Sequence, residues 1–282
     1  MTLGSSLVGD SFMEEKKKSR AEIVKENSQG LRGEGKGRSM AEVVFRVSQG
    51  TAERAEEKTY RVPISSGLVV LDAILYIQAH FAPDLAVRWN CKAGKCGSCS
   101  AEVNGKPCLM CKTRVDDFSP GEEIVVYPLK TFPRIKDLVT DVAWNYKVNQ
   151  KIVPFAPPKD TAWKMFQVDM DRVQEFRTCI ECFLCQDVCH VLRNHDKKDE
   201  FAGPRFFVRV AGLEMHPLDT ASRLHYLKQE GGLGLCNITN CCTEVCPENI
   251  RITENAIIPL KERVVDEFYD PLRRLFRVFT GK

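Results

Sequence analysis

The sequence predicts an α+β fold made of two consecutive parts, a first part that mixes strands with one helix and a second part that is helical. Three observations support this. Val43, Phe45 and Val47 alternate with polar residues, as in a half-buried strand. Prolines crowd the stretch 154–159, where they end regular structure. Beyond that stretch, apolar residues recur mainly with the spacing of amphipathic helices.

The expected elements of the first part follow one another along the chain. Strands are expected at 43–47 and 60–64, and the turn Ser65-Ser66-Gly67 separates the second strand from a helix at 69–80. A loop rich in cysteine and glycine comes next. The run Ile124-Val125-Val126-Tyr127 is typical of a strand that closes the sheet.

The second part and the chain start complete the predicted organisation. Helical patterns are expected at 165–177, 204–213, 219–229 and 257–269. Residues 1–39 are rich in Lys, Glu, Ser and Gly without periodicity, which predicts a disordered extension. The predicted domains are therefore 40–145 and 146–282.

Composition excludes several classes of protein and makes the cysteines the informative feature. The chain is 43% hydrophobic with a formal net charge of +3, which gives no argument for a nucleic-acid partner. No apolar run reaches the roughly 18–20 residues of a membrane span, and we recognise no signal peptide. Disulfides are a poor expectation in a reducing cytosol. The thirteen cysteines are therefore candidate metal ligands, and the five histidines lack the paired spacing of zinc fingers.

The first cysteine group has the spacing of plant-type [2Fe–2S] ferredoxins, C-x4-C-x2-C and a distant fourth cysteine. Gly97 allows the loop to bring backbone N–H groups close to sulfur. Lys92 and Lys95 carry charge that can offset the negative cluster. The spacing leaves the fourth ligand open, and the candidates are Cys91, Cys96, Cys99 and either Cys108 or Cys111.

Two further groups lie in the helical part. The first is the bacterial ferredoxin run C-x2-C-x2-C-x3-C, and it consists of Cys179, Cys182, Cys185 and Cys189. The second has Thr239 where such a run has its second cysteine, and it consists of Cys236, Cys242 and Cys246. In two-cluster ferredoxins the fourth cysteine of a run binds the other cluster.

That crossing rule predicts the ligand sets. Three cysteines of the first run and one of the second give four thiolates for [4Fe–4S], namely Cys179, Cys182, Cys185 and Cys246. The vacancy at Thr239 leaves three thiolates, a number that suits [3Fe–4S], namely Cys189, Cys236 and Cys242. Cys241 is an alternative donor, but we interpret Cys108 and Cys241 as ordinary small buried residues.

Taken together, these motifs resemble the iron–sulfur subunits of succinate dehydrogenase and fumarate reductase. Further matching motifs are Leu129-x3-Pro133-x3-Asp137-Leu138-Val139-x-Asp141 and Gly203-Pro204, and the resemblance covers about 43–270. It implies a plant-type ferredoxin (β-grasp) domain followed by an all-helical bacterial-ferredoxin-like domain. It also implies that the fourth [2Fe–2S] ligand is Cys111, twelve residues after Cys99.

The resemblance implies a function as well. A partner flavoprotein with bound FAD would hold the dicarboxylate, and electrons would pass through [2Fe–2S], [4Fe–4S] and [3Fe–4S] to a membrane quinone. One or more transmembrane anchor subunits would hold the chain at the cytoplasmic side of the bacterial inner membrane. We expect a succinate:quinone oxidoreductase. The alternatives are a quinol:fumarate reductase, another flavoprotein reductase, a free ferredoxin and a zinc-stabilised module.

The acceptor side departs from ubiquinone-reducing members of that family. Those members have Pro at the position of His190 and His at the position of Asn237. They also have a Trp in the place where this chain has the stretch Arg193-Asn194. His190, Arg193 and Asn237 are candidates for contacting a menaquinone-type quinone, although His190 can equally serve packing. Basic and apolar residues in 270–282 suggest contact with the anchor or with anionic lipid, or alternatively a solvated helix.

Overall fold

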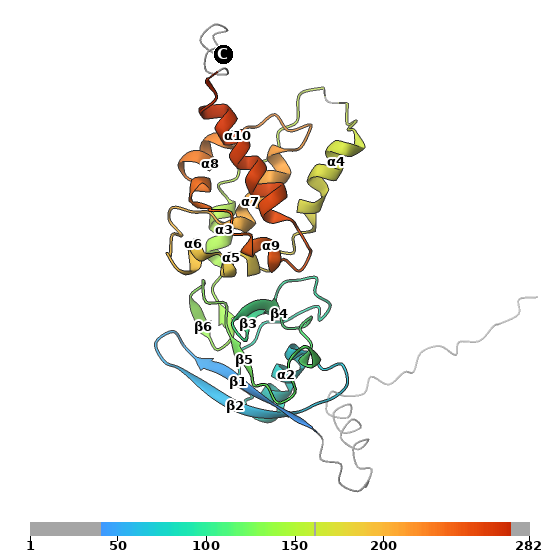
Figure 1. Cartoon of the computed structure of the whole chain (residues 1–282), viewed down its shortest axis with the longest axis vertical. Coiled ribbons are helices and arrows are strands. Elements are labelled where there is room, and N and C mark those ends of the chain that lie inside the picture. Colours follow the sequence, from blue (N-terminus) through green and yellow to red (C-terminus); the bar gives the residue numbers. More distant parts are fainter. Residues whose placement is uncertain (1–40, 161, 272–282) are drawn as a thin grey trace, which may run out of the picture. The chain divides into compact units, whose positions relative to one another are not determined.

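The computed structural model describes residues 41–160 and 162–271, which form one compact unit beginning at Ala41. Figure 1 shows the strands in the first half of this unit and the helices in the second half. The predicted α+β class is therefore confirmed. The expected extension 1–39 and the basic segment 272–282 lie outside the described residues.

A five-stranded sheet forms the first half, with strand order β2-β1-β5-β3-β4. Strand β1 pairs antiparallel with β2 and parallel with β5, and β3 pairs antiparallel with both β4 and β5. Helix α2 (Val70–His80) buries its apolar face in the same core as the strands. The strands are β1 (Glu42–Gly50), β2 (Ala55–Pro63), β3 (Ser100–Val103), β4 (Lys106–Leu109) and β5 (Ile124–Tyr127).

A short hairpin and one helix lead from the sheet to the helical half. The hairpin turns at Asp137, whose φ of 48° lies in the left-handed region and whose carboxylate is buried. This carboxylate accepts N–H groups from Gly50 and from Ala86, each at 2.7 Å. Asp137 thereby fastens the hairpin to the sheet. The elements are β6 (Arg134–Lys136), β7 (Val139–Thr140) and α3 (Ala143–Asn149).

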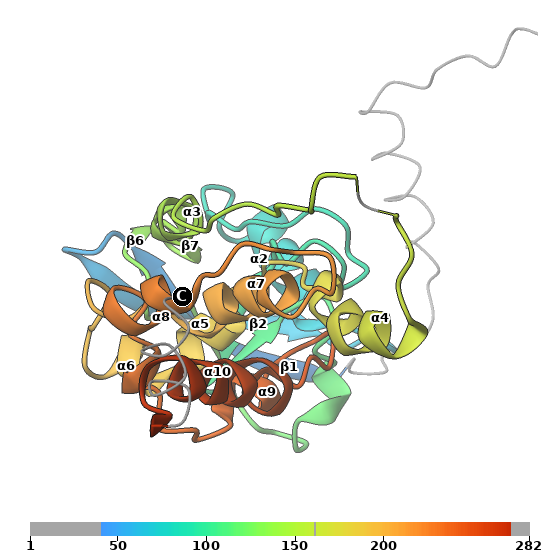
Figure 2. The same ribbon diagram turned by 90° about the horizontal axis from the view of Figure 1, so that it is seen from above.

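The helical half contains short helices joined by the cysteine-bearing loops. All four expected helical patterns correspond to observed helices. Figures 1 and 2 show α4 at the periphery of this half and α7 nearer its middle. The elements are α4 (Gln167–Gln174), η2 (Glu175–Thr178), α5 (Leu184–Val188), α6 (His190–Arg193), α7 (Pro204–Glu214), α8 (Leu224–Gln229), η3 (Leu233–Leu235), α9 (Cys241–Glu244), the π-helical η4 (Ile252–Ile257) and α10 (Ile258–Phe268).

Helix α8 begins at residue 224 and not at 219 as expected, because the preceding residues fold around a buried arginine. The guanidinium of Arg223 is 2% exposed and donates to the carboxylate of Asp219 at 2.8 Å. It also donates to the carbonyls of Val153 at 2.8 Å and Pro154 at 3.0 Å. This arginine ties the start of α8 to the proline-rich stretch.

Two hydrophobic cores meet where the two halves join. Phe183 and Leu184, from the helical half of the sequence, belong to the core of the sheet. Trp144 packs against both cores. In residues 41–160 and 162–271, no helix combines the length and the apolar character that crossing a bilayer requires.

Candidate iron–sulfur sites

The first cysteine group lies on the loop that precedes β3. The Cys91 thiol accepts the backbone N–H groups of Ala93 and Lys95, each at 3.3 Å. Burial would raise the pKa of the Cys96 thiol, but hydrogen bonds from Ser98 and the backbone outweigh burial and lower that pKa to about 6. The loop therefore presents hydrogen-bond donors to sulfur, as an anionic cluster requires.

Cys108 and Cys111 are both candidates for the fourth ligand of this group, and their side chains have different surroundings in the structure. Cys111 is buried, and its thiol contacts the Cys99 thiol. Burial, together with the neighbouring thiol of Cys111, raises the pKa of Cys99 to about 12. The Cys108 thiol instead contacts the Thr113 hydroxyl and is partly exposed.

The second group surrounds a cavity. Four cysteines line this cavity, and they come from two segments far apart in the sequence: Cys179, Cys182, Cys185 and Cys246. Burial raises the pKa of Cys182 to about 12, and the nearby thiols of Cys179 and Cys246 add to this effect. Four cysteines that line one cavity are the donor set that suits a [4Fe–4S] cluster.

The remaining cysteines of the helical half form a third group. Burial raises the pKa of Cys189 to about 11, and the neighbouring side chains of Cys241 and Cys236 raise it further. Burial also raises the pKa of Cys242 to about 12, and the other three thiols contribute. Cys241 therefore lies near the cysteines of the third group. The prediction that Cys108 and Cys241 are simply buried is wrong, since both are partly exposed.

Thr239, the residue at the vacant ligand position, lies beside the third group. Its hydroxyl is 3.4 Å from the Cys241 sulfur and 3.5 Å from Nδ1 of His190. Asn237 is exposed on the same loop, between the partly exposed Cys236 and the exposed Ile238. Two of the three acceptor-side candidates are thus on or next to this loop.

Arg193, the third acceptor-side candidate, is instead held in a partly buried ion-pair network. Its two terminal nitrogens donate to the carboxylate of Glu102 on β3, at 2.5 and 3.1 Å. The Glu102 side chain is completely buried and also pairs with Lys130 at 3.1 Å. Burial and the neighbouring Glu102 raise the pKa of Asp187 to about 7, against an opposing hydrogen bond from Thr131.

In the described ranges 41–160 and 162–271, no three His, Cys, Asp or Glu side chains converge closely enough to hold one metal ion. A tetrahedral zinc site needs all its donors at about 2.0–2.3 Å from a single ion.

The first and second groups are in direct contact. A Cβ atom on Gly97 would lie 2.7 Å from the α-carbon of Cys182. The Ser100 hydroxyl lies 2.9 Å from the Cys182 carbonyl oxygen. Lys95 forms an ion pair with Glu248 at 3.0 Å, so its charge is shared with the loop that follows Cys246. The cysteine loops of the two halves therefore form one packed unit.

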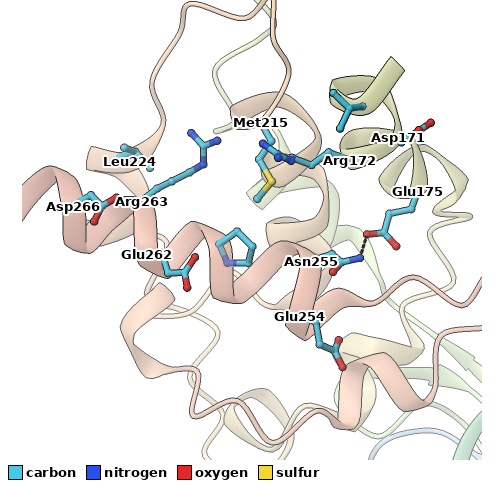
Figure 3. A pocket seen from close by; sticks show the side chains of 12 residues that line it. Asp171, Arg172, Glu175, Met215, Leu224, Glu254, Asn255, Glu262, Arg263 and Asp266 are labelled. Carbon is cyan, nitrogen blue, oxygen red and sulfur yellow. Dashed lines mark hydrogen bonds between the residues drawn. The ribbon is translucent and has the colours of Figure 1, made fainter. Parts of the chain in front are cut away.

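A large groove of about 870 Å³ runs between α4 and α10 and is lined by none of the cysteines. Figure 3 shows Glu175 bonded to Asn255, at 2.5 Å, and the charged side chains of Glu262, Arg263 and Asp266 along α10. Five carboxylates and two arginines line the groove, so its lining is net acidic.

The two cysteine-bearing regions match known domain families. Residues 42–146 match the 2Fe-2S iron-sulfur cluster binding domain. Residues 175–250 match the 4Fe-4S dicluster domain.

Several known proteins are similar over most of the described chain. The fumarate reductase iron-sulfur subunit of Escherichia coli O6:H1 is 31% identical over 198 residues, which cover 68% of this chain and 79% of that protein. The uncharacterized iron-sulfur protein MMP1067 of Methanococcus maripaludis is 31% identical over 223 residues, 76% of this chain, but the match spans only 42% of that longer protein.

A solved structure is more similar still. A chain of the Mycobacterium smegmatis Sdh1 complex in the apo form is 56% identical, with a TM-score of 0.81, and the match covers 83% of this chain and all of that one. These similarities confirm the family expected from the motifs. The chain belongs to the iron–sulfur subunits of the succinate dehydrogenase and fumarate reductase family.

Proposed function

We propose that this chain is the electron-transfer subunit of a succinate:quinone oxidoreductase. It would relay electrons from the FAD of a partner flavoprotein, where the dicarboxylate binds, to a membrane quinone of the menaquinone type. The observation that carries the proposal is the crossing of ligands. Cys246 lines one cavity with Cys179, Cys182 and Cys185, although its sequence neighbour Cys242 stands with Cys189.

The ligand sets follow from the three groups. We assign [2Fe–2S] to Cys91, Cys96, Cys99 and Cys111, and the contact between the Cys99 and Cys111 thiols supports Cys111 over Cys108. The cavity of the second group supports a [4Fe–4S] cluster on Cys179, Cys182, Cys185 and Cys246. The non-cysteine residue Thr239 supports a [3Fe–4S] cluster on Cys189, Cys236 and Cys242.

When bound, the clusters accept and release single electrons, which couples a two-electron reaction at flavin to the quinone. The protein residues position and insulate them. Amide N–H groups at Cys91 stabilise negative charge on sulfur, and burial of Cys99, Cys185 and Cys242 keeps water away. The close approach of Gly97 to Cys182 keeps the first and second cluster loops together.

The acceptor side is assigned to the third group. His190, beside Thr239, and the exposed Asn237 are suited to contact a quinone head group. Because both terminal nitrogens of Arg193 already pair with Glu102, we assign Arg193 a positioning role behind this surface. The exposed Leu235 and Ile238 offer apolar contacts to a transmembrane anchor subunit, which would hold the chain peripherally at the cytoplasmic side of the membrane.

A second candidate, quinol:fumarate reductase, is favoured by the similarity to the E. coli O6:H1 fumarate reductase subunit. The two functions use the same clusters in opposite directions. The test is purification from membranes with the partner subunits, followed by two assays. Faster succinate-driven quinone reduction supports the first function, and faster quinol-driven fumarate reduction supports the second. The absence of both activities in a complex that contains FAD and iron would contradict the proposal.

A further inference from the structure

Arg205 is a buried cation at the wall of the four-cysteine cavity. It occupies the first turn of α7, is 3% exposed and lines the cavity together with Cys179 and Cys182. One terminal nitrogen donates to Oδ1 of Asn149 at 2.7 Å, and the other pairs with the Glu181 carboxylate. Both ends of the guanidinium fork are therefore fixed.

The third nitrogen of this guanidinium is different. Nε of Arg205 is buried, and it has no hydrogen-bond partner among the described residues, the cavity sulfurs included. A buried N–H group of a charged side chain without an acceptor costs free energy. Since the side chain lines the cavity and its other nitrogens are engaged, the missing acceptor is expected inside the cavity.

The backbone around Arg205 fixes the start of the helix that carries it. Gly203 has φ of 87°, and a Cβ atom there would lie 2.1 Å from Oε1 of Gln186. The same oxygen accepts the backbone N–H of Arg205 at 3.3 Å. Glu181, which pairs with Arg205, lies between the ligands Cys179 and Cys182. The arginine is thus tied to the ligand loop and cannot easily withdraw from the cavity.

We propose that the Nε–H of Arg205 donates a hydrogen bond to a sulfide of the [4Fe–4S] cluster and that its charge raises the reduction potential of this cluster. The assignment rests on the proposed function. Reduction adds negative charge to the cluster, so a nearby cation and a donor to sulfur both favour the reduced form. Arg205 is a positioning and tuning residue for electron transfer.

Arg209 supplies a matched control on the same helix. It also pairs with Glu181, at 2.7 Å, but its side chain is 44% exposed and does not line the cavity. Solvent and salt screen an exposed charge far more than a buried one. Loss of the Arg209 charge should therefore affect the cluster much less than loss of Arg205.

The first test is an EPR-monitored redox titration of the purified complex. In Arg205→Met the equilibrium constant for reducing the [4Fe–4S] cluster should fall at least tenfold, which is 59 mV for one electron. The [2Fe–2S] midpoint should not change, and Arg209→Gln should leave both midpoints close to wild type. An unchanged [4Fe–4S] midpoint in Arg205→Met, or an equal shift in Arg209→Gln, would overturn the assignment.

The second test is decided in the wild-type complex, so its outcome does not require that a variant assembles. Wild-type complex with ¹⁵N-arginine should show a nitrogen hyperfine coupling in pulsed EPR of the reduced [4Fe–4S] cluster. Arg205→Lys should lose it, and Arg209→Gln should keep it. A [4Fe–4S] signal without arginine coupling in the wild type would refute this assignment alone. A wild-type complex with no [4Fe–4S] signal would refute the proposed function, and the assignment with it.

Discussion

The α-carbons of Gly97 and Cys182 lie so close that the space for a methyl group on Gly97 is occupied. The Cβ atom of an alanine there would be 2.7 Å from the Cys182 α-carbon and 2.9 Å from its Cβ. The first residue belongs to the plant-type loop and the second to the ferredoxin run. This contact therefore joins two cluster-binding loops that are separated by more than eighty residues of sequence.

The contact predicts that Gly97→Ala is strongly destabilising. Gly97 has φ of 67°, and this left-handed conformation would cost an alanine about 1–2 kcal/mol of folding free energy. Forcing the two backbones apart adds about 1–3 kcal/mol. Gly105→Ala is the control, because Gly105 has φ of 78° and no atom near its Cβ position. Thermal melting should show the larger loss for Gly97→Ala, and equal losses would contradict the packing argument.

A second prediction separates the two candidate ligands of the first group. Cys111→Ser should remove the [2Fe–2S] signal, since Cys111 is buried against Cys99. Cys108→Ser should keep that signal, because the Cys108 thiol faces Thr113. Visible absorption and EPR of the reduced protein measure both. Loss of the signal only in Cys108→Ser would reverse the assignment.

Stability should also depend on pH through the buried carboxyl of Asp187. Its pKa rises from 3.8 to about 7 on folding, mainly because of burial. The folded state therefore binds more protons between pH 4 and 7, and this group makes folding less favourable as pH rises through that window. At about 1.4 kcal/mol per pKa unit the effect is on the order of 4 kcal/mol.

Asp187→Asn tests this dependence, since the amide oxygen can still accept the N–H group of Thr131. The melting temperature of the variant relative to wild type should increase from pH 5 to pH 8. The pKa of Glu102 is lowered from its ordinary value, because hydrogen bonds from Arg193, Asp187 and Lys130 outweigh burial. A difference that stays constant with pH would show that Asp187 does not titrate there.

The acceptor side can be tested at His190. His190→Ala should lower the rate of quinone reduction or raise the KM for quinone, while the electron transfer from succinate to an artificial acceptor that bypasses the quinone stays unchanged. His195→Ala is the control, because this ring packs edge-on against His190, with 6.3 Å between centroids, but is not bonded to Thr239. Unchanged quinone kinetics in His190→Ala would contradict a role in quinone binding and would show that His190 serves packing only.

The sequence can assign the cysteines to three groups because ligand spacing is a local property. The strand pattern at 43–47 and the helix pattern at 69–80 are local too, and both elements are observed. The network of Glu102 with Asp187 and Arg193 is not foreseeable in this way. Glu102 occupies an ordinary strand position, and Asp187 and Arg193 are more than eighty residues away, so no local pattern indicates that it is buried or paired with them.

The same limit applies to buried arginines. Arg205 follows a Gly-Pro pair and reads as an ordinary early helix residue, while Arg223 falls within a pattern that predicts a longer helix. Only the packed structure places the first against the cysteine cavity and the second under the proline-rich stretch. Burial of a long charged side chain depends on distant partners, which spacing does not encode.

The most direct test of the cluster relay is EPR of two cysteine variants of the purified complex. Cys246→Ser should lose the [4Fe–4S] signal of the reduced protein and keep the [3Fe–4S] signal of the oxidised protein. Cys189→Ser should do the reverse, because the fourth cysteine of each run binds the other cluster. If Cys246→Ser instead loses the [3Fe–4S] signal and keeps [4Fe–4S], the crossed ligation is wrong and the assigned order of clusters falls with it.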